Sequence, residues 1–141
     1  MEKYFEIALK EAKKAYKKNE VPVGAIIVKN NKIIAKSCNN RQKKFNVLGH
    51  AEINCIKKAT KKIKDWRLDG CDMYVTLEPC EMCQLIIKET RINNVFFLLK
   101  RDYQQKNGKK TNINQTNDCK ITKKSYEMLL KNFFSKLRNK I

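Results

Sequence analysis

Residues 49–52, Gly-His-Ala-Glu, and residues 79–83, Pro-Cys-Glu-Met-Cys, are the two stretches around which the rest of the chain is organised. Together they supply an imidazole, two thiols and a carboxylate, and His50 is the only histidine among the 141 residues. A catalytic zinc ion is held by three protein ligands and keeps its fourth position for water. We therefore predict that His50, Cys80 and Cys83 bind one zinc ion.

Glu52 lies two residues after His50 and is not needed as a ligand. A carboxylate at this position can reach the same water without binding the metal, so we predict that Glu52 moves the proton in catalysis. A closed structural zinc site is the alternative, and it would need a fourth ligand from another cysteine. The other cysteines are Cys38, Cys55, Cys71 and Cys119. None of them forms a second paired motif, and a closed site gives Glu52 no role.

The spacing of apolar residues predicts alternating helices and strands along the chain. The predicted helices are 2–18, 51–63, 81–90 and 125–140, and the predicted strands are 21–28, 32–37, 72–77 and 94–99. Residues 100–120 are polar, and we expect a long loop that is interrupted by one short strand at most. On the last helix, Phe133 and Phe134 are expected to pack in the core. This order of elements is typical of an α/β domain.

Both predicted ligand segments fall at the start of a helix. Pro79 suits the first position of a helix because its φ is fixed and it has no N–H to leave unpaired. Cys80 and Cys83 would then lie in the first turn, where the helix dipole favours the thiolate. His50 and Glu52 would occupy the first turn of the preceding helix. The sequence thus predicts two helix N-termini that meet at one metal ion.

The length of the chain fits one domain over residues 1–141 with a buried core. There is no run of about 18 apolar residues and no signal-peptide pattern at the N-terminus, so we expect a soluble, cytoplasmic protein with no membrane partner. In a reducing compartment, metal binding and burial explain the six cysteines better than disulfides do.

The net charge of +18 favours a polyanionic partner, because clustered Lys and Arg bind phosphates by releasing counterions. A composition bias gives a second explanation. Nearly all of the excess is Lys, and Asn and Ile are abundant too, as an AT-rich genome would impose on any protein. The charge alone leaves both explanations open, since it bears on association and solubility and not on fold.

The pattern H-x-E followed by P-C-x-x-C is the signature of zinc nucleobase deaminases. Beyond it, the chain resembles the bacterial tRNA-specific adenosine deaminases, which convert adenosine to inosine at the wobble position of a tRNA anticodon. The resemblance runs from the first helix to about Phe97 and resumes in the last helix. Other segments that carry it are Glu20-Val21-Pro22-Val23-Gly24-Ala25, Trp66-Arg67-Leu68 and Thr90-Arg91-Ile92.

This resemblance implies a cytidine deaminase-like fold, a three-layer α/β/α sandwich around a mixed central sheet. It also implies a zinc-dependent hydrolase, a homodimer and a tRNA anticodon arm as the partner. By the same resemblance, Asn39, Ala51 and Val21 would contact the substrate, with Asn39 hydrogen-bonded to the base. The sequence departs from the family pattern at 47–49, 84–86 and 98–120. These segments would surround the substrate and not the metal.

Three functions therefore remain to be compared. The first is deamination of a wobble adenosine in tRNA, and the net charge favours it. The second is deamination of a free base or nucleoside such as cytosine or guanine by the same zinc chemistry, and the departures around the substrate favour it. The third is a binding module with a structural zinc ion, and Glu52 argues against it.

Overall fold

The computed structural model describes residues 1–101, 113–116 and 119–139. The helices are α1 (Glu2–Lys17), α2 (Ala51–Ile63), α3 (Glu81–Glu89) and α4 (Lys120–Arg138). The strands are β1 (Gly24–Lys29), β2 (Lys32–Cys38), β3 (Cys71–Leu77), β4 (Asn94–Leu99) and β5 (Ile113–Gln115). Among these residues, no helix is both long enough and apolar enough to cross a membrane.

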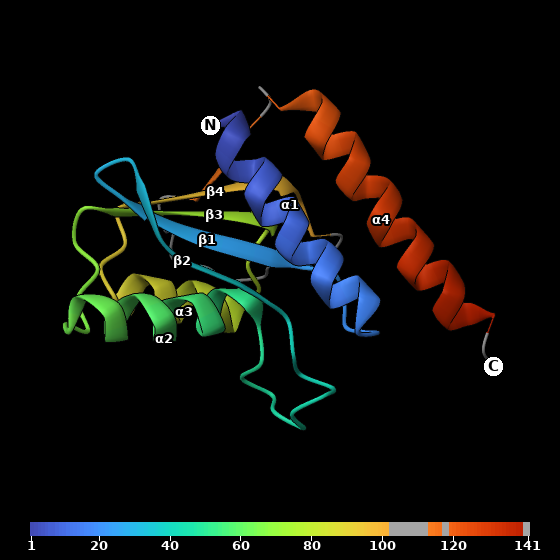
Figure 1. The fold of residues 1–141 in the computed structure, drawn as a ribbon, viewed down its shortest axis with the longest axis horizontal. Coiled ribbons are helices and arrows are strands. Elements are labelled where there is room, and N and C mark those ends of the chain that lie inside the picture. Colours follow the sequence, from blue (N-terminus) through green and yellow to red (C-terminus); the bar gives the residue numbers. More distant parts are fainter. Residues whose placement is uncertain (102–112, 117–118, 140–141) are drawn as a thin grey trace.

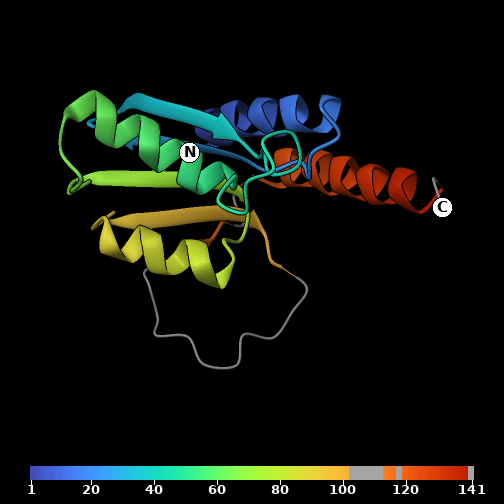
Figure 2. The ribbon, with the colours of Figure 1, turned by 90° about the horizontal axis from the view of Figure 1, so that it is seen from below.

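The strands form one sheet in the order β2-β1-β3-β4-β5. β1 pairs antiparallel with β2 and β3, whereas β3 and β4, like β4 and β5, run parallel, so the sheet is mixed. α1 and α4 lie on one face of the sheet and α2 and α3 on the other (Figure 1). The view from below has α2 and α3 in front of the strands (Figure 2). This is the predicted three-layer α/β/α sandwich.

The contact between α1 and β1 is close because a glycine stands at Gly24. A Cβ atom there would lie 2.0 Å from the carbonyl oxygen of Ala8 and 2.6 Å from the nitrogen of Ala12. No larger residue fits without moving the helix. The buried face of α1, which includes Phe5, therefore rests directly on the sheet, and this fixes where β1 runs.

The starts of two predicted elements were wrong by more than one residue. The first strand begins at Gly24 and not at residue 21, because the N–H of Val23 bonds the carbonyl of Val21 at 2.9 Å in a tight turn around Pro22. The last helix begins at Lys120 and not at residue 125. Its first turn carries no apolar stripe, and it is held by tertiary contacts such as the hydrogen bond from Thr122 to Glu2.

Within the expected 100–120 loop, β5 is the one short strand that the sequence analysis allowed. Residues 102–112 and 117–118 of this loop lie outside the described residues. The pair of phenylalanines on α4 is divided. Phe133 is buried, as predicted, but Phe134 is 44% exposed, so its assignment to the core was wrong. A helix turns by about 100° per residue, so adjacent side chains point in different directions, and of this pair on α4 only Phe133 faces inward.

Candidate active site

Two helix starts deliver the three predicted metal ligands. His50 is the N-cap of α2 and Cys80 is the N-cap of α3, each with an extended backbone. Neither N-cap side chain bonds the backbone of its own helix, so both are available to another partner. Cys83 lies in the first turn of α3 and is fully buried.

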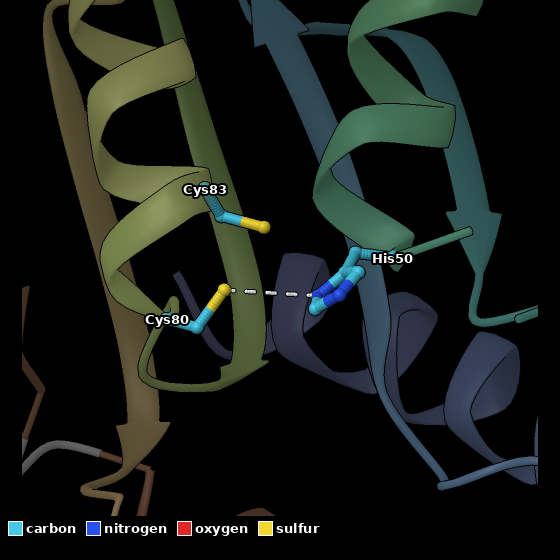
Figure 3. A group of neighbouring side chains, drawn as sticks. All are labelled: His50, Cys80 and Cys83. Carbon is cyan, nitrogen blue, oxygen red and sulfur yellow. Dashed lines mark hydrogen bonds between the residues drawn. The ribbon is translucent and has the colours of Figure 1, made fainter. Parts of the chain in front are cut away.

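The three side chains point toward one another from the two helices (Figure 3). Their candidate ligand atoms all lie within 4.8 Å of each other, and Cys80 Sγ is 3.8 Å from His50 Nδ1. Tetrahedral zinc, with bonds of about 2.3 Å to sulfur and 2.0 Å to nitrogen, would separate these two atoms by about 3.5 Å. The donor set of one imidazole and two thiols also suits zinc. The group therefore fits this metal.

No further group of three or more His, Cys, Asp or Glu side chains comes together within the described part of the chain. The other cysteines, including the buried Cys55, are not members of the group. The Cys55 thiol instead contacts the carbonyl of Ala25 at 3.6 Å, and burial raises its pKa. A fourth cysteine ligand, which a closed structural site would need, is therefore not present beside these three.

The two thiols are electrostatically different in the protein alone. The pKa of Cys80 is lowered to about 3, mainly by a hydrogen bond from the Cys83 thiol and to a smaller extent by one with His50. The same contact with Cys80, together with burial, raises the pKa of Cys83. Cys80 is thus the more acidic of the two thiols. Metal binding at this group would release the remaining thiol proton, because thiolates are the ligands.

Glu52 lies in the first turn of α2, as the second residue of the helix and two residues after the N-cap His50. Its side chain is 1% exposed, and burial raises the pKa of its carboxyl. Among the described residues, Oε2 has no hydrogen-bond partner. A buried polar atom without a partner is costly and is usually retained for chemistry. The Glu52 carboxylate is one of the groups that raise the pKa of the Cys83 thiol, so it lies beside the metal ligands.

A pocket of about 820 Å³ opens next to His50. Two of the predicted substrate-binding residues, Asn39 and Val21, line it. The third, Ala51, is fully buried, and its N–H donates to Asn39 Oδ1 at 2.7 Å. This hydrogen bond fixes the Asn39 side chain, so the group that Asn39 can offer to the pocket is its amide NH2.

Three cationic residues of this pocket, Arg41, Lys100 and Arg101, were not among the predicted site residues. Arg101 is held against the segment that leads into α3, since its Nε donates to the Glu78 carbonyl at 2.7 Å and its N–H donates to Glu78 Oε1 at 3.1 Å. The predicted ends of β3 and β4 could have indicated that Arg101 lies at the site. Two parallel neighbouring strands that end at residues 77 and 99 place their next residues at the same edge of the sheet.

Phe134 of α4 was also missed as a pocket residue, and it lines the same cavity. The last helix thereby contributes one aromatic side chain to a site whose metal ligands lie on the opposite layer. No local motif indicates this contact, because it depends on how α4 packs against α1 and β4.

Comparison with known proteins identifies the family. The family model of the cytidine and deoxycytidylate deaminase zinc-binding region matches residues 1–99. A tRNA-specific adenosine deaminase of Aquifex aeolicus is 38% identical over 150 aligned positions, which cover 99% of this chain and 97% of that relative. The tRNA-specific adenosine deaminase of Bacillus subtilis is 46% identical over 96 residues, which cover 68% of this chain and 60% of the relative.

Solved structures give the same result. One from work on A-to-I editing by tRNA:A34 deaminases at the wobble position of transfer RNA has 39% sequence identity and a TM-score of 0.69, covering 70% of this chain and 76% of that one. A guanine deaminase from Bacillus subtilis has 34% identity and a TM-score of 0.67, covering 70% of this chain and 64% of that one. The fold, the zinc-binding signature and the full-length relative together show that this chain belongs to the cytidine and deoxycytidylate deaminase family, in its branch of tRNA-specific adenosine deaminases.

Proposed function

We propose that this protein is a zinc-dependent hydrolase that deaminates adenosine to inosine at the wobble position of a tRNA anticodon. One observation carries the proposal. A His-Cys-Cys group that fits zinc, and a buried carboxylate whose Oε2 has no partner among the described residues, lie beside a pocket whose wall holds three cations. The first two features are the parts of a hydrolytic deaminase, and the third suits a phosphate-bearing substrate.

In this proposal His50, Cys80 and Cys83 hold one zinc ion per chain. The ion supplies the means to make water nucleophilic near neutral pH. Glu52 takes the proton of the attacking water and delivers it to the amine that leaves as ammonia. Its burial supports this role, because a group whose charged form is disfavoured accepts a proton readily and can return it.

The pocket residues would orient the base. Asn39 donates from its amide NH2 to an acceptor nitrogen of the purine, and its Oδ1 stays on the Ala51 N–H. Val21 supplies an apolar wall on which a base can pack. The two arginines and Lys100 meet the phosphates on either side of the extruded nucleotide.

We further propose that residues 1–141 act as one domain and that the enzyme works as a cytoplasmic homodimer with the tRNA anticodon arm as its partner. The resemblance of the whole chain to the Aquifex relative supports the single domain. Sedimentation of the zinc-loaded protein, alone and with an anticodon stem–loop, tests the oligomeric state and the partner together.

A guanine deaminase activity is the second candidate. The solved guanine deaminase structure from Bacillus subtilis is 34% identical to this chain, close to the 39% of the structure from the tRNA:A34 deaminase work. The pocket of about 820 Å³ also has room for a free purine. A free base carries no phosphate, however, so this function gives the cationic wall no role.

The test is a direct competition between substrates. Zinc-loaded protein is incubated with an anticodon stem–loop that carries a wobble adenosine, and separately with free guanine, cytosine and adenosine. We expect inosine at the wobble position and no comparable turnover of the free compounds. A matched stem–loop with the adenosine moved by one position is the control. Faster conversion of guanine than of the stem–loop would overturn the proposal in favour of the second candidate.

A further inference from the structure

The turn at residues 41–45, Arg-Gln-Lys-Lys-Phe, carries an aromatic side chain that nothing in the described part of the chain covers. Phe45 is 96% exposed. Its φ of 49° lies in the left-handed region, which bulky side chains rarely adopt. An exposed phenylalanine in a disfavoured backbone conformation does not stabilise the folded chain. Such an outlier indicates that the side chain serves to contact a binding partner.

This turn is held firmly in place. The Glu20 carboxylate is 1% exposed and accepts hydrogen bonds from the N–H of Gln42, at 2.6 and 3.1 Å, and from the N–H of Lys43, at 3.3 Å. Within the turn, the Phe45 N–H donates to the Gln42 carbonyl at 3.3 Å. The phenyl ring is therefore presented from a braced loop, which lowers the entropic cost of binding a partner.

The turn also adjoins the active-site pocket. Arg41 lines the pocket together with His50. The N–H of Asn46 bonds the Arg41 carbonyl at 3.0 Å, so Phe45 lies within one turn of chain from the pocket wall. The loop that carries it extends away from the three layers (Figure 1).

Charge identifies the kind of partner. Arg41, Lys43 and Lys44 flank the ring and are all exposed. Lys100 and Arg101 extend the positive charge into the pocket. Exposed aromatic rings among cations form the usual surface for single-stranded nucleic acid, where bases stack on the rings and phosphates meet the cations. The core of a protein–protein interface is instead depleted of charged residues, and lysine in particular is rare there.

We propose that the 41–45 turn binds a nucleotide that flanks the target adenosine, with its base stacked on Phe45 and its phosphate at Lys43 and Lys44. This inference rests on the proposed function and extends it, since it assigns a contact outside the pocket. The turn also falls in a segment that leads directly into the departure of this chain from its family pattern at 47–49.

The experiment places the fluorescent base 2-aminopurine in turn at each nucleotide flanking the target in a stem–loop. Its fluorescence is quenched when it stacks. We expect quenching at one flanking position, which is lost in Phe45→Ala and kept in Phe45→Trp. Because stacking on an aromatic ring is worth a factor of about 5 to 150 in affinity, Phe45→Ala should weaken stem–loop binding by that factor.

The matched control is Trp66→Ala. Trp66 is another exposed aromatic residue, at 59%, with Arg67 and Arg91 near its ring. It follows the far end of α2, whose 13 residues span about 20 Å, so its loss should leave stem–loop binding unchanged. Glu20→Gln tests whether the Glu20 carboxylate holds the turn in place. In this variant, the amide hydrogens of Gln42 and Lys43 should exchange faster than in the parent protein.

The outcomes separate this inference from the function beneath it. Failure of the parent protein to deaminate the stem–loop would overturn the proposed function and this contact with it. Normal deamination, with Phe45→Ala binding within twofold of the parent, would overturn the contact alone. A change in the sedimentation of Phe45→Ala without RNA would also overturn it, because Phe45 would then belong to an interface between copies of this chain.

Discussion

Replacing Glu52 with Gln separates the chemistry of the site from its stability. The substitution keeps the shape of the side chain and removes its ability to accept a proton. General acid–base groups contribute about 10²- to 10⁴-fold, so we expect turnover to fall by that factor, which corresponds to a rise of about 3–5 kcal/mol in activation free energy. Zinc content should stay at the parent level, because Glu52 is not a ligand in the proposed site.

Although Glu52→Gln should lower turnover, we expect it to raise the stability of the fold. Glu52 is 1% exposed and its Oε2 has no partner among the described residues, so its charged form is poorly solvated. A neutral amide relieves part of that cost, and we expect the free energy of unfolding to rise on the order of 1 kcal/mol. For a chain of this size this corresponds to about 3 °C in Tm. Thermal denaturation, elemental analysis and single-turnover deamination measure the three quantities.

Glu11→Gln is the matched control for this experiment. Glu11 is also buried, at 5% exposed, but it pairs with Lys14 at 2.6 Å on α1, away from the metal ligands. Its loss should leave turnover unchanged and lower stability slightly, since a half-exposed ion pair is worth at most about 1 kcal/mol. Two results would refute the reasoning. One is a zinc-replete Glu52→Gln that keeps more than about a tenth of the activity, and the other is loss of zinc from it.

Three further predictions concern the metal, the core and the substrate. Cys83→Ala should lose zinc and lower Tm together, because metal binding is coupled to folding, and full zinc by elemental analysis would contradict the ligand role. Tyr126→Phe should cost about 1–2 kcal/mol at pH 7 in denaturant titrations, since its buried hydroxyl donates to a backbone carbonyl at 2.7 Å. Burial raises the pKa of Tyr126 above its usual 10.0, so the unfolded chain ionises first and the parent loses stability as pH rises through 10, a loss that should be smaller in the variant. Reversing Lys136 and Arg138 to Glu should weaken stem–loop binding and reduce the slope of its salt dependence by about one unit per lost contact. If neither salt nor the substitutions changed the affinity for the stem–loop, the +18 charge would be explained by composition bias.

The sequence was most informative where one residue type has one explanation. A single histidine and a Cys-x-x-Cys pair leave few ways to hold a catalytic metal, and the structure brings His50, Cys80 and Cys83 within 4.8 Å of each other. The strand at 94–99 was predicted at its observed bounds, because a continuous apolar run ends abruptly in charge on its C-terminal side. In these places local pattern and tertiary structure agree.

The sequence was least informative where tertiary contacts decide. The first turn of α4 has no apolar stripe, and Phe134 turns to the pocket although its neighbour Phe133 is buried. Arg101 joins the site only because β3 and β4 run parallel and end together. Periodicity reports which face of an element is apolar, but it does not report which distant element meets that face.

The placement of the metal ligands on two separate helix starts has a consequence for the order of folding. His50 and Cys80 are far apart along the chain, and all of α2 and β3 lie between them. The ligand atoms can meet only after α2 has docked on the sheet and β3 has paired within it, because those elements aim the two N-caps at one point. Assembly of the three-ligand site is therefore a late event, and binding of zinc with all three ligands during refolding would report the completion of the sandwich and not its beginning.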